Sequence, residues 1–255
     1  MASELQFEII GILNVTPDSF SDGGNFFTAT AAIQQAKQLF ADGAAIVDVG
    51  AESTNPWSSP LSAAEEWSRL ENVLPQLVKQ FPGKLSLDTY HPETATKALQ
   101  IDPTIIINDV TMFRNPKLVA VVAQHKAQCI VSHLSPDSPT IADAHANPRT
   151  RSVDQVRSEL LATYNLLVEH GVPAEQIILD PGIGFGKTME LNRQLLGFAQ
   201  EMPEHHVLIG YSRKRFLGEN RMDTAPNLAA GKIAKQAGAR YIRVHDVAAH
   251  RQLLD

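Results

Sequence analysis

Short runs of aliphatic and β-branched residues alternate along the chain with segments in which apolar residues recur every three or four positions. The first pattern is typical of buried parallel strands, and the second is typical of helices that cover a sheet with one face. We expect strands near Phe7–Leu13, Ala45–Val49, Leu85–Asp88, Ile105–Asn108, Cys129–Ser132, Ile177–Leu179, Val207–Ile209 and Tyr241–Val244. We expect helices near Ala29–Asp42, Ala63–Gln80, Pro92–Gln100, Pro116–His125, Val153–His170, Met189–Gln200, Pro226–Ala237 and Val247–Leu254.

Capping residues and prolines refine these boundaries. Ser62 and Ser152 each precede an expected helix, and the Glu or Gln three residues later completes the capping-box spacing. Pro75 lies inside the second expected helix and predicts a kink or a break there, because proline cannot donate the internal hydrogen bond. The longest irregular stretch, Leu134–Arg151, is rich in Pro, Asp and Ser, and we expect a mobile loop there.

Eight strands that alternate with eight helices predict an α/β fold with a parallel sheet. Eight such pairs within 255 residues favour a closed (β/α)8 barrel, the TIM-barrel architecture, over an open doubly wound sheet. No linker, composition break or internal repeat interrupts the pattern. We therefore expect residues 1–255 to form one barrel domain, with mobile loops after the strands at its C-terminal face.

Composition excludes several classes of protein. No apolar run approaches the roughly 20 residues that span a bilayer, and the N-terminus has no basic start or apolar region of a secretory signal. Cys129 is the single cysteine, which excludes an intrachain disulfide and a multi-cysteine zinc site. The net charge of −6 argues against non-specific nucleic-acid binding. We expect a cytoplasmic protein that binds neither nucleic acid nor membrane.

Polar residues gather at the carboxyl ends of the expected strands, which is where the active sites of parallel barrels form. Asn, Asp and Ser also cap helices, so a structural role stays open for any single position, although it explains the whole set poorly. The set comprises Asn14, Glu52, Ser53, Thr54, Asp88, Asn108, Asp109, His133, Asp180, Ser212, Arg213, Lys214, Arg243, His245 and Asp246.

Two parts of this set suggest a ligand. Asp88, Asn108 and Asp180 suit the mixed donor and acceptor edge of a flat heterocycle, because carboxylates pair with adjacent N–H groups and an amide serves both roles. Positive charge for an anionic group is available from three residues: Arg213, Lys214 and Arg243. The glycine-rich segment 182–188 is not a P-loop, since Pro181 stands where the first glycine of that motif belongs.

Seven segments resemble, in order, the signatures of the dihydropteroate synthase family: Gly11–Gly24, Asp48–Thr54, Ser86–Thr89, Ile107–Asp109, Asp180–Lys187, Gly210–Lys214 and Arg243–Asp246. The family is a pterin-binding (β/α)8 barrel of folate biosynthesis. It condenses 6-hydroxymethyl-7,8-dihydropterin pyrophosphate with p-aminobenzoate to give 7,8-dihydropteroate and pyrophosphate. The resemblance implies that pyrophosphate departs to leave a pterin cation, which the arylamine then attacks.

The resemblance also implies residue roles. The pterin would be held by Asp88, Asn108, Asp180 and Lys214, and the pyrophosphate by Asn14, Thr54, Arg243 and His245. The p-aminobenzoate site would comprise Phe20, Pro56, Phe185, Ser212, Lys214 and Arg215. The catalytic set would be Asp22, Lys214, Arg243 and His245, with Asp22 stabilising the cation. A Mg2+ cofactor ligated by Asn14, a homodimer, and competition by p-aminobenzoate mimics such as sulfonamides are implied as well.

Two departures from the family pattern leave alternatives open. Asn55 stands where the family has an arginine, and losing a hydrogen bond to a charged group would weaken pyrophosphate binding by about one to two powers of ten. The stretch Cys129–Leu134 also differs, with His133 offset by one from the family histidine. The alternatives are a catalytically weak pterin-binding paralogue, a methyltetrahydrofolate:corrinoid methyltransferase-like barrel, and a non-enzymatic binding or scaffold protein.

Overall fold

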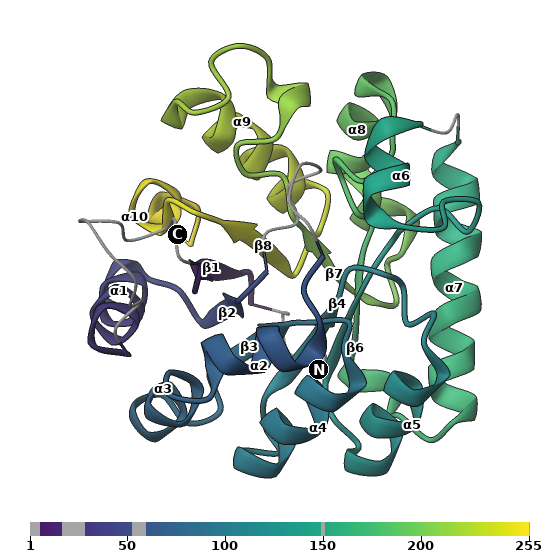
Figure 1. The fold of residues 1–255 in the computed structure, drawn as a ribbon. Helices are drawn as coiled ribbons and strands as arrows, with labels where there is room; N and C mark the ends of the chain where they lie inside the picture. Colours follow the sequence, from purple (N-terminus) through teal and green to yellow (C-terminus); the bar gives the residue numbers. More distant parts are fainter. Residues whose placement is uncertain (1–5, 17–28, 53–59, 149–150, 255) are drawn as a thin grey trace, which may run out of the picture.

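The computed structural model describes residues 6–16, 29–52, 60–148 and 151–254. Eight parallel strands pair in chain order, and the last pairs with the first, so the sheet closes into a barrel (Figure 1). The strands are β1 (Glu8–Asn14), β2 (Ile46–Gly50), β3 (Leu85–Asp88), β4 (Ile106–Asp109), β5 (Cys129–Ser132), β6 (Ile177–Asp180), β7 (His206–Ile209) and β8 (Tyr241–Val244). The predicted barrel is confirmed, and each strand lies within one residue of its expected bounds.

Helices surround the barrel on the outside (Figure 1). They are α1 (Ala29–Asp42), α2 (Ala63–Leu70), α3 (Leu74–Gln80), α4 (Pro92–Ile101), α5 (Pro116–His125), α6 (Ile141–Ala146), α7 (Val153–Glu169), α8 (Met189–Gln194), α9 (Thr224–Gln236) and α10 (Val247–His250). The predicted break at Pro75 is confirmed, because the proline lies in the first turn of α3. Both predicted capping boxes are present, at the starts of α2 and α7.

Two expectations about helices need correction. The stretch Leu134–Arg151 is not an uninterrupted loop, because it contains α6, whose first turn is capped by the side chain of Thr140. The expected helix Met189–Gln200 changes character after α8 and continues as a 3-10 helix, η3 (Leu195–Glu201). No helix in the described parts of the chain has the length and apolar character needed to cross a membrane.

The barrel interior consists of layers, and their order follows from the two-residue repeat of a strand. An apolar layer is formed by Ile10, Ile46, Ile106, Ile130, Ile178, Leu208 and Tyr241. In five of these strands a polar residue stands two positions later: Asp48, Asn108, Ser132, Asp180 and Arg243. A step of two residues returns to the same face of a strand. The polar residues therefore form the next layer, toward the carboxyl ends of the strands.

The strand residues between these positions point outward and pack against the helices. Val47, Leu87, Ile107 and Val131 belong to the main buried core, together with helix residues such as Leu118. The outer core and the apolar inner layer hold the strands in fixed register, so that the polar layer has a rigid base. The barrel is thus a scaffold that presents charged side chains at one end.

Candidate active site

A buried aspartate of β2, Asp48, connects three other strands inside the barrel. Its Oδ1 accepts a hydrogen bond from Ser86 Oγ. Its Oδ2 accepts one from Asn108 Nδ2 at 3.0 Å and one from Arg243 Nη1 at 3.3 Å. Only 4% of Asp48 is exposed, so its charge requires these partners. Sequence reasoning missed Asp48 as a site residue, although a lone carboxylate inside the apolar run Ile46–Gly50 is a signal that could have found it.

Asp180, at the end of β6, forms a second anchor of the polar layer. Its Oδ1 accepts from the backbone N–H of Gly182 at 2.7 Å, and its Oδ2 accepts from Ser132 Oγ at 3.3 Å. The Arg243 NH2 lies 3.8 Å from the same Oδ2, so that the guanidinium lies between Asp180 and Asp48. Burial lowers the pKa of Arg243, but the neighbouring carboxylates outweigh burial and raise that pKa above its ordinary value.

Two groups of the polar layer have capacity left for a ligand. Asn108 is fully buried, and its Oδ1 has no hydrogen-bond partner among the described residues. A buried acceptor of this kind is satisfied when a ligand N–H reaches it. Asp88, at the end of β3, is half-buried, and burial followed by the charge of Asp48 raises its pKa well above the usual value, with Arg243 opposing. Asp88 therefore holds a proton more readily than an exposed aspartate does.

Asn14 lies at the exposed end of β1, and Gly50 of β2 separates it from Asp88 at the end of β3. A Cβ atom added to Gly50 of β2 would lie 3.7 Å from Asn14 Oδ1 and 3.8 Å from Asp88 Oδ2. Both oxygens thus lie beside Gly50, with no side chain of β2 between them. Asn14 and Asp88 consequently each place a side-chain oxygen beside Gly50 at the carboxyl ends of the strands.

Lys214 enters the mouth from the loop after β7. Its Nζ donates to the carbonyl oxygen of Ile183 and lies 4.9 Å from the centroid of the Phe185 ring. Gly184 has a φ of +87°, and a Cβ there would lie 2.8 Å from Lys214 Cδ, so glycine is required for this close approach. Burial lowers the pKa of Lys214 to about 8, although the carboxylate of Asp180 acts to raise it.

Ser212 and His245 form a polar pair between the ends of β7 and β8. Ser212 Oγ accepts from the backbone N–H of His245 at 3.2 Å and lies 2.9 Å from its Nδ1. In the tautomer in which the Ser212 hydroxyl donates to Nδ1, the imidazole proton is on Nε2. Burial, followed by the charges of Arg213, Arg243 and Lys214, lowers the pKa of His245 to about 4. His245 is therefore neutral near pH 7.

A pocket of about 1070 Å³ opens beside these groups. Four of the predicted arylamine-site residues line it, Phe185, Ser212, Lys214 and Arg215, and so does His245. The remaining lining residues are His145, Pro148, Gly184, Gly186, Lys187, Thr188, Met189, Asn192, Arg213, Phe216 and Met222. The loops after β5, β6, β7 and β8 all contribute to this wall, so the barrel brings together residues that are about 100 positions apart in the sequence.

Four predicted site residues, Phe20, Asp22, Thr54 and Pro56, lie outside the described residues, and so does the departure at Asn55. His133 is described, but it is fully buried and its Nε2 lies 2.7 Å from Glu159 Oε2 of α7. Its ring is thus engaged with the outer layer of helices, and the alignment with a family histidine of the pterin wall gains no support from this contact.

Lys187, which gives segment 182–188 its P-loop appearance, is directed into the protein. Its Nζ donates to the carbonyl oxygens of Gly182, Phe185 and His133 at 2.8, 3.1 and 3.2 Å. These three acceptors use all three donors of the ammonium group. Burial lowers the pKa of Lys187 to about 7. The residue therefore connects the loop after β6 with the end of β5.

Comparisons with known proteins agree with this geometry. The chain matches the family model described as pterin binding enzyme over residues 10–245. It is 37% identical over 265 residues to the dihydropteroate synthase of Synechocystis sp., covering 96% of this chain and 87% of that protein.

Two solved structures extend the likeness to three dimensions. The Xanthomonas albilineans dihydropteroate synthase with 4-aminobenzoic acid has a TM-score of 0.85 at 36% identity, covering 98% of this chain and 91% of that one. The Thermus thermophilus dihydropteroate synthase in complex with 6HMPPP has a TM-score of 0.80 at 36% identity, covering 98% of this chain and 92% of that one.

Proposed function

The chain belongs to the family of pterin-binding enzymes, and on this basis we propose that its barrel mouth catalyses the dihydropteroate synthase reaction. The protein is a transferase that joins 6-hydroxymethyl-7,8-dihydropterin pyrophosphate to p-aminobenzoate, yielding 7,8-dihydropteroate and pyrophosphate. The observation that carries this conclusion is the polar layer around Arg243, which has an unfilled acceptor on Asn108, together with the pocket lined by Phe185, Lys214 and His245.

The pterin would occupy the centre of the barrel mouth. Its N–H and amino groups would donate to Asp180 and to the free Oδ1 of Asn108, while Asp88 completes the edge. The Asp48 carboxylate holds the Asn108 amide nitrogen at 3.0 Å, so Asn108 is oriented before the substrate arrives. Preorganised partners of this kind strengthen recognition, because little side-chain freedom is lost on binding.

The pyrophosphate would lie toward Arg243, His245 and Asn14. The guanidinium carries permanent charge, and the neutral imidazole would offer the N–H of Nε2 as a donor in the tautomer in which Ser212 donates to Nδ1. Charge that develops on the departing group is stabilised by donors already aimed at it. We propose that Thr54, which lies outside the described residues, also binds the pyrophosphate.

Asn14 fits a role as a magnesium ligand. Mg2+ in phosphate-transfer sites takes one or two oxygen ligands from the protein and the rest from substrate phosphates and water. The Asn14 oxygen is exposed and lies beside Gly50, as does Asp88 Oδ2, so a hard cation would find oxygen donors here. When bound, Mg2+ would neutralise charge on the pyrophosphate leaving group.

The p-aminobenzoate would bind in the pocket between Phe185 and Lys214, beside Ser212 and Arg215. Departure of pyrophosphate leaves a positive charge that the pterin ring delocalises. The arylamine nitrogen donates its electron pair to the exocyclic carbon and then releases one proton. An aniline is neutral at pH 7, so no strong general base is required. Asp22, outside the described residues, is proposed to stabilise the cation.

A homodimer and a cytoplasmic location accompany this proposal. Sedimentation velocity of the purified protein should give one species with twice the mass of the 27.9 kDa chain. A monomer across the micromolar range would contradict the dimer.

The reaction is tested by following pyrophosphate release from dihydropterin pyrophosphate with Mg2+ and p-aminobenzoate. Release should depend on p-aminobenzoate and equal the dihydropteroate formed. Pterin binding without release would instead favour the weak paralogue with Asn55, and transfer of a methyl group from methyltetrahydrofolate to cobalamin would favour the corrinoid alternative. Absence of any pterin binding would favour the scaffold.

A further inference from the structure

The segment between β5 and α7 forms part of the pocket wall. A Cβ added to Gly186 would lie 2.7 Å from the carbonyl oxygen of Ala144 in α6, so α6 packs directly on the loop after β6. Ala144 and Phe185 belong to one buried apolar cluster with Val110 and Leu134. α6 is therefore continuous with the surface on which the Phe185 ring rests.

His145 is the residue of α6 that reaches the pocket. Its ring centroid lies 5.6 Å from that of Phe185, with the two planes at 43°, and both side chains line the same pocket. Lys214 contacts the same phenyl ring from the loop after β7. The ring of Phe185 thus contacts an imidazole and an ammonium group that come from different loops.

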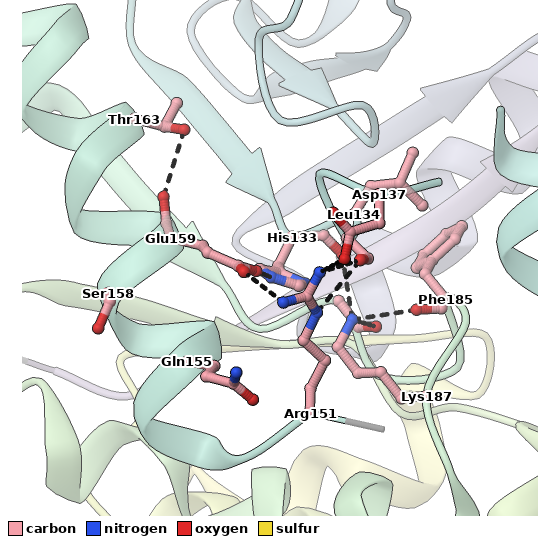
Figure 2. A network of polar contacts seen from close by, with 12 residues as sticks. His133, Leu134, Asp137, Arg151, Gln155, Ser158, Glu159, Thr163, Phe185 and Lys187 are labelled. Carbon is pink, nitrogen blue, oxygen red and sulfur yellow. Dashed lines mark hydrogen bonds and ion pairs between the residues drawn. The ribbon is translucent and has the colours of Figure 1, made fainter. Parts of the chain in front are cut away.

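Charged side chains hold this wall in place (Figure 2). Arg151 donates to Ser135 Oγ at 2.7 Å and forms ion pairs with Asp137 and, at 2.8 Å, with Glu159 of α7. Glu159 in turn contacts His133 at the end of β5 (Figure 2).

A second arginine binds the same turn. Arg114, which precedes α5, donates to the carbonyl oxygens of Leu134, Ser135 and Ser138. Backbone carbonyls that are engaged by fixed cations leave the segment little freedom to move aside. The turn Leu134–Ser138, which leads into α6, is therefore held in place by two arginines.

We propose that His145 is a specificity-determining residue of the arylamine site, limiting the length of the arylamine that fits against Phe185. The inference rests on the proposed function, because it assigns the pocket to the arylamine. The imidazole supports the phenyl ring on which the substrate ring would lie and closes the pocket on the side of α6. Removing it lengthens the pocket without altering the groups that hold the pterin.

The test compares two acceptors of equal charge, p-aminobenzoate and the longer 4′-aminobiphenyl-4-carboxylate. His145→Ala should raise the ratio of kcat/KM for the long acceptor to that for the short one by about tenfold, the scale on which a pocket discriminates by size. His145→Phe keeps a ring at this position and should leave the ratio near the wild-type value. The ratio is independent of how much of each preparation is folded.

His170→Ala is the matched control, since His170 follows α7 at the opposite end of the barrel. An unchanged ratio in His145→Ala, or an equal rise in the control, would overturn the proposal. Failure of the wild-type protein to use p-aminobenzoate at all would instead contradict the proposed function. The two failures are therefore distinguishable in one set of assays.

Discussion

Two clusters of charged residues, one buried and one partly buried, lie at the same end of the barrel, and their hydrogen bonds differ in kind. The inner cluster, formed by Asp48, Asn108, Asp180 and Arg243, joins side chains to side chains and leaves the Asn108 Oδ1 without a partner among the described residues. The outer cluster is formed by Arg114, His133, Arg151, Glu159 and Lys187. In it, Arg114 and Lys187 donate to backbone carbonyls, and Figure 2 shows the contacts of Lys187.

This difference suggests that the inner cluster binds a ligand, whereas the outer cluster fixes the position of a loop. Lys187 uses all three donors on carbonyl oxygens, so it has nothing left to offer a ligand. Arg243 is held by the side-chain carboxylates of Asp48 and Asp180, in the polar layer toward the carboxyl ends of the strands. A cation paired with side chains at a mouth can exchange partners with a substrate, whereas a cation bound to the backbone fixes the position of a loop.

The largest effect should follow removal of the central cation. Arg243→Ala leaves the carboxylates of Asp48 and Asp180 uncompensated in the interior, so the free energy of unfolding should fall by about 3–5 kcal/mol. Urea denaturation measures this loss, and turnover should disappear as well. Neutralising a partner, in Arg243→Met with Asp48→Asn, should recover much of the stability without recovering turnover. A stable and active Arg243→Ala protein would contradict both roles assigned to Arg243, compensation of the buried carboxylates and participation in turnover.

Lys187→Met tests the outer cluster by the same measurement, the free energy of unfolding from urea denaturation. The substitution leaves three buried carbonyl oxygens without their donor, and the free energy of unfolding should fall by about 2–3 kcal/mol. Pterin affinity of the folded protein, measured by calorimetry, should change far less than in the inner-cluster variants. A selective loss of pterin affinity with stability intact would show that Lys187 belongs to the binding site after all.

Asp180→Asn should lower pterin affinity more than stability, the reverse of what we expect for Lys187→Met. The amide keeps the shape and can still accept from Gly182, but the charged acceptor for the pterin edge is lost. Pterin affinity should decrease by about 1.5–3 kcal/mol, the range for hydrogen bonds to charged groups. Calorimetric titration with the pterin and a thermal melt separate affinity from stability. Unchanged binding would refute the pterin role of Asp180.

The smallest effect concerns pH. Burial lowers the pKa of Lys214 to about 8 from its ordinary 10.5, so the free enzyme loses this positive charge as pH rises through about 8. Because kcat/KM reports ionisations of the free enzyme, it should fall on the alkaline side of pH 8. Lys214→Arg should keep kcat/KM constant there, since arginine remains charged. A wild-type profile that is flat from pH 7 to 9.5 would contradict the role of Lys214.

Much of the fold and part of the site could be predicted from residue patterns alone. Strand bounds followed from short aliphatic runs, because residues buried on both faces of a parallel sheet carry little polarity. The candidate site residues Asp88, Asn108, Asp180 and Lys214 were proposed because they stand at or just after strand ends. Helix α6 was missed, since its six residues carry too short a repeat to outweigh the prolines and serines around it.

The order of residues along the chain is enough to predict the barrel, the family and the polar end of each strand, since all three depend on local patterns. Which of those polar groups meet depends on closure of the barrel in space. Closure of β8 against β1 brings Arg243 to Asp48, 195 residues earlier in the chain, and turns Lys187 toward backbone carbonyls while Lys214 enters the pocket. Both lysines follow a strand end in the sequence, but the partner that a buried charge finds depends on which loops surround it in the folded protein.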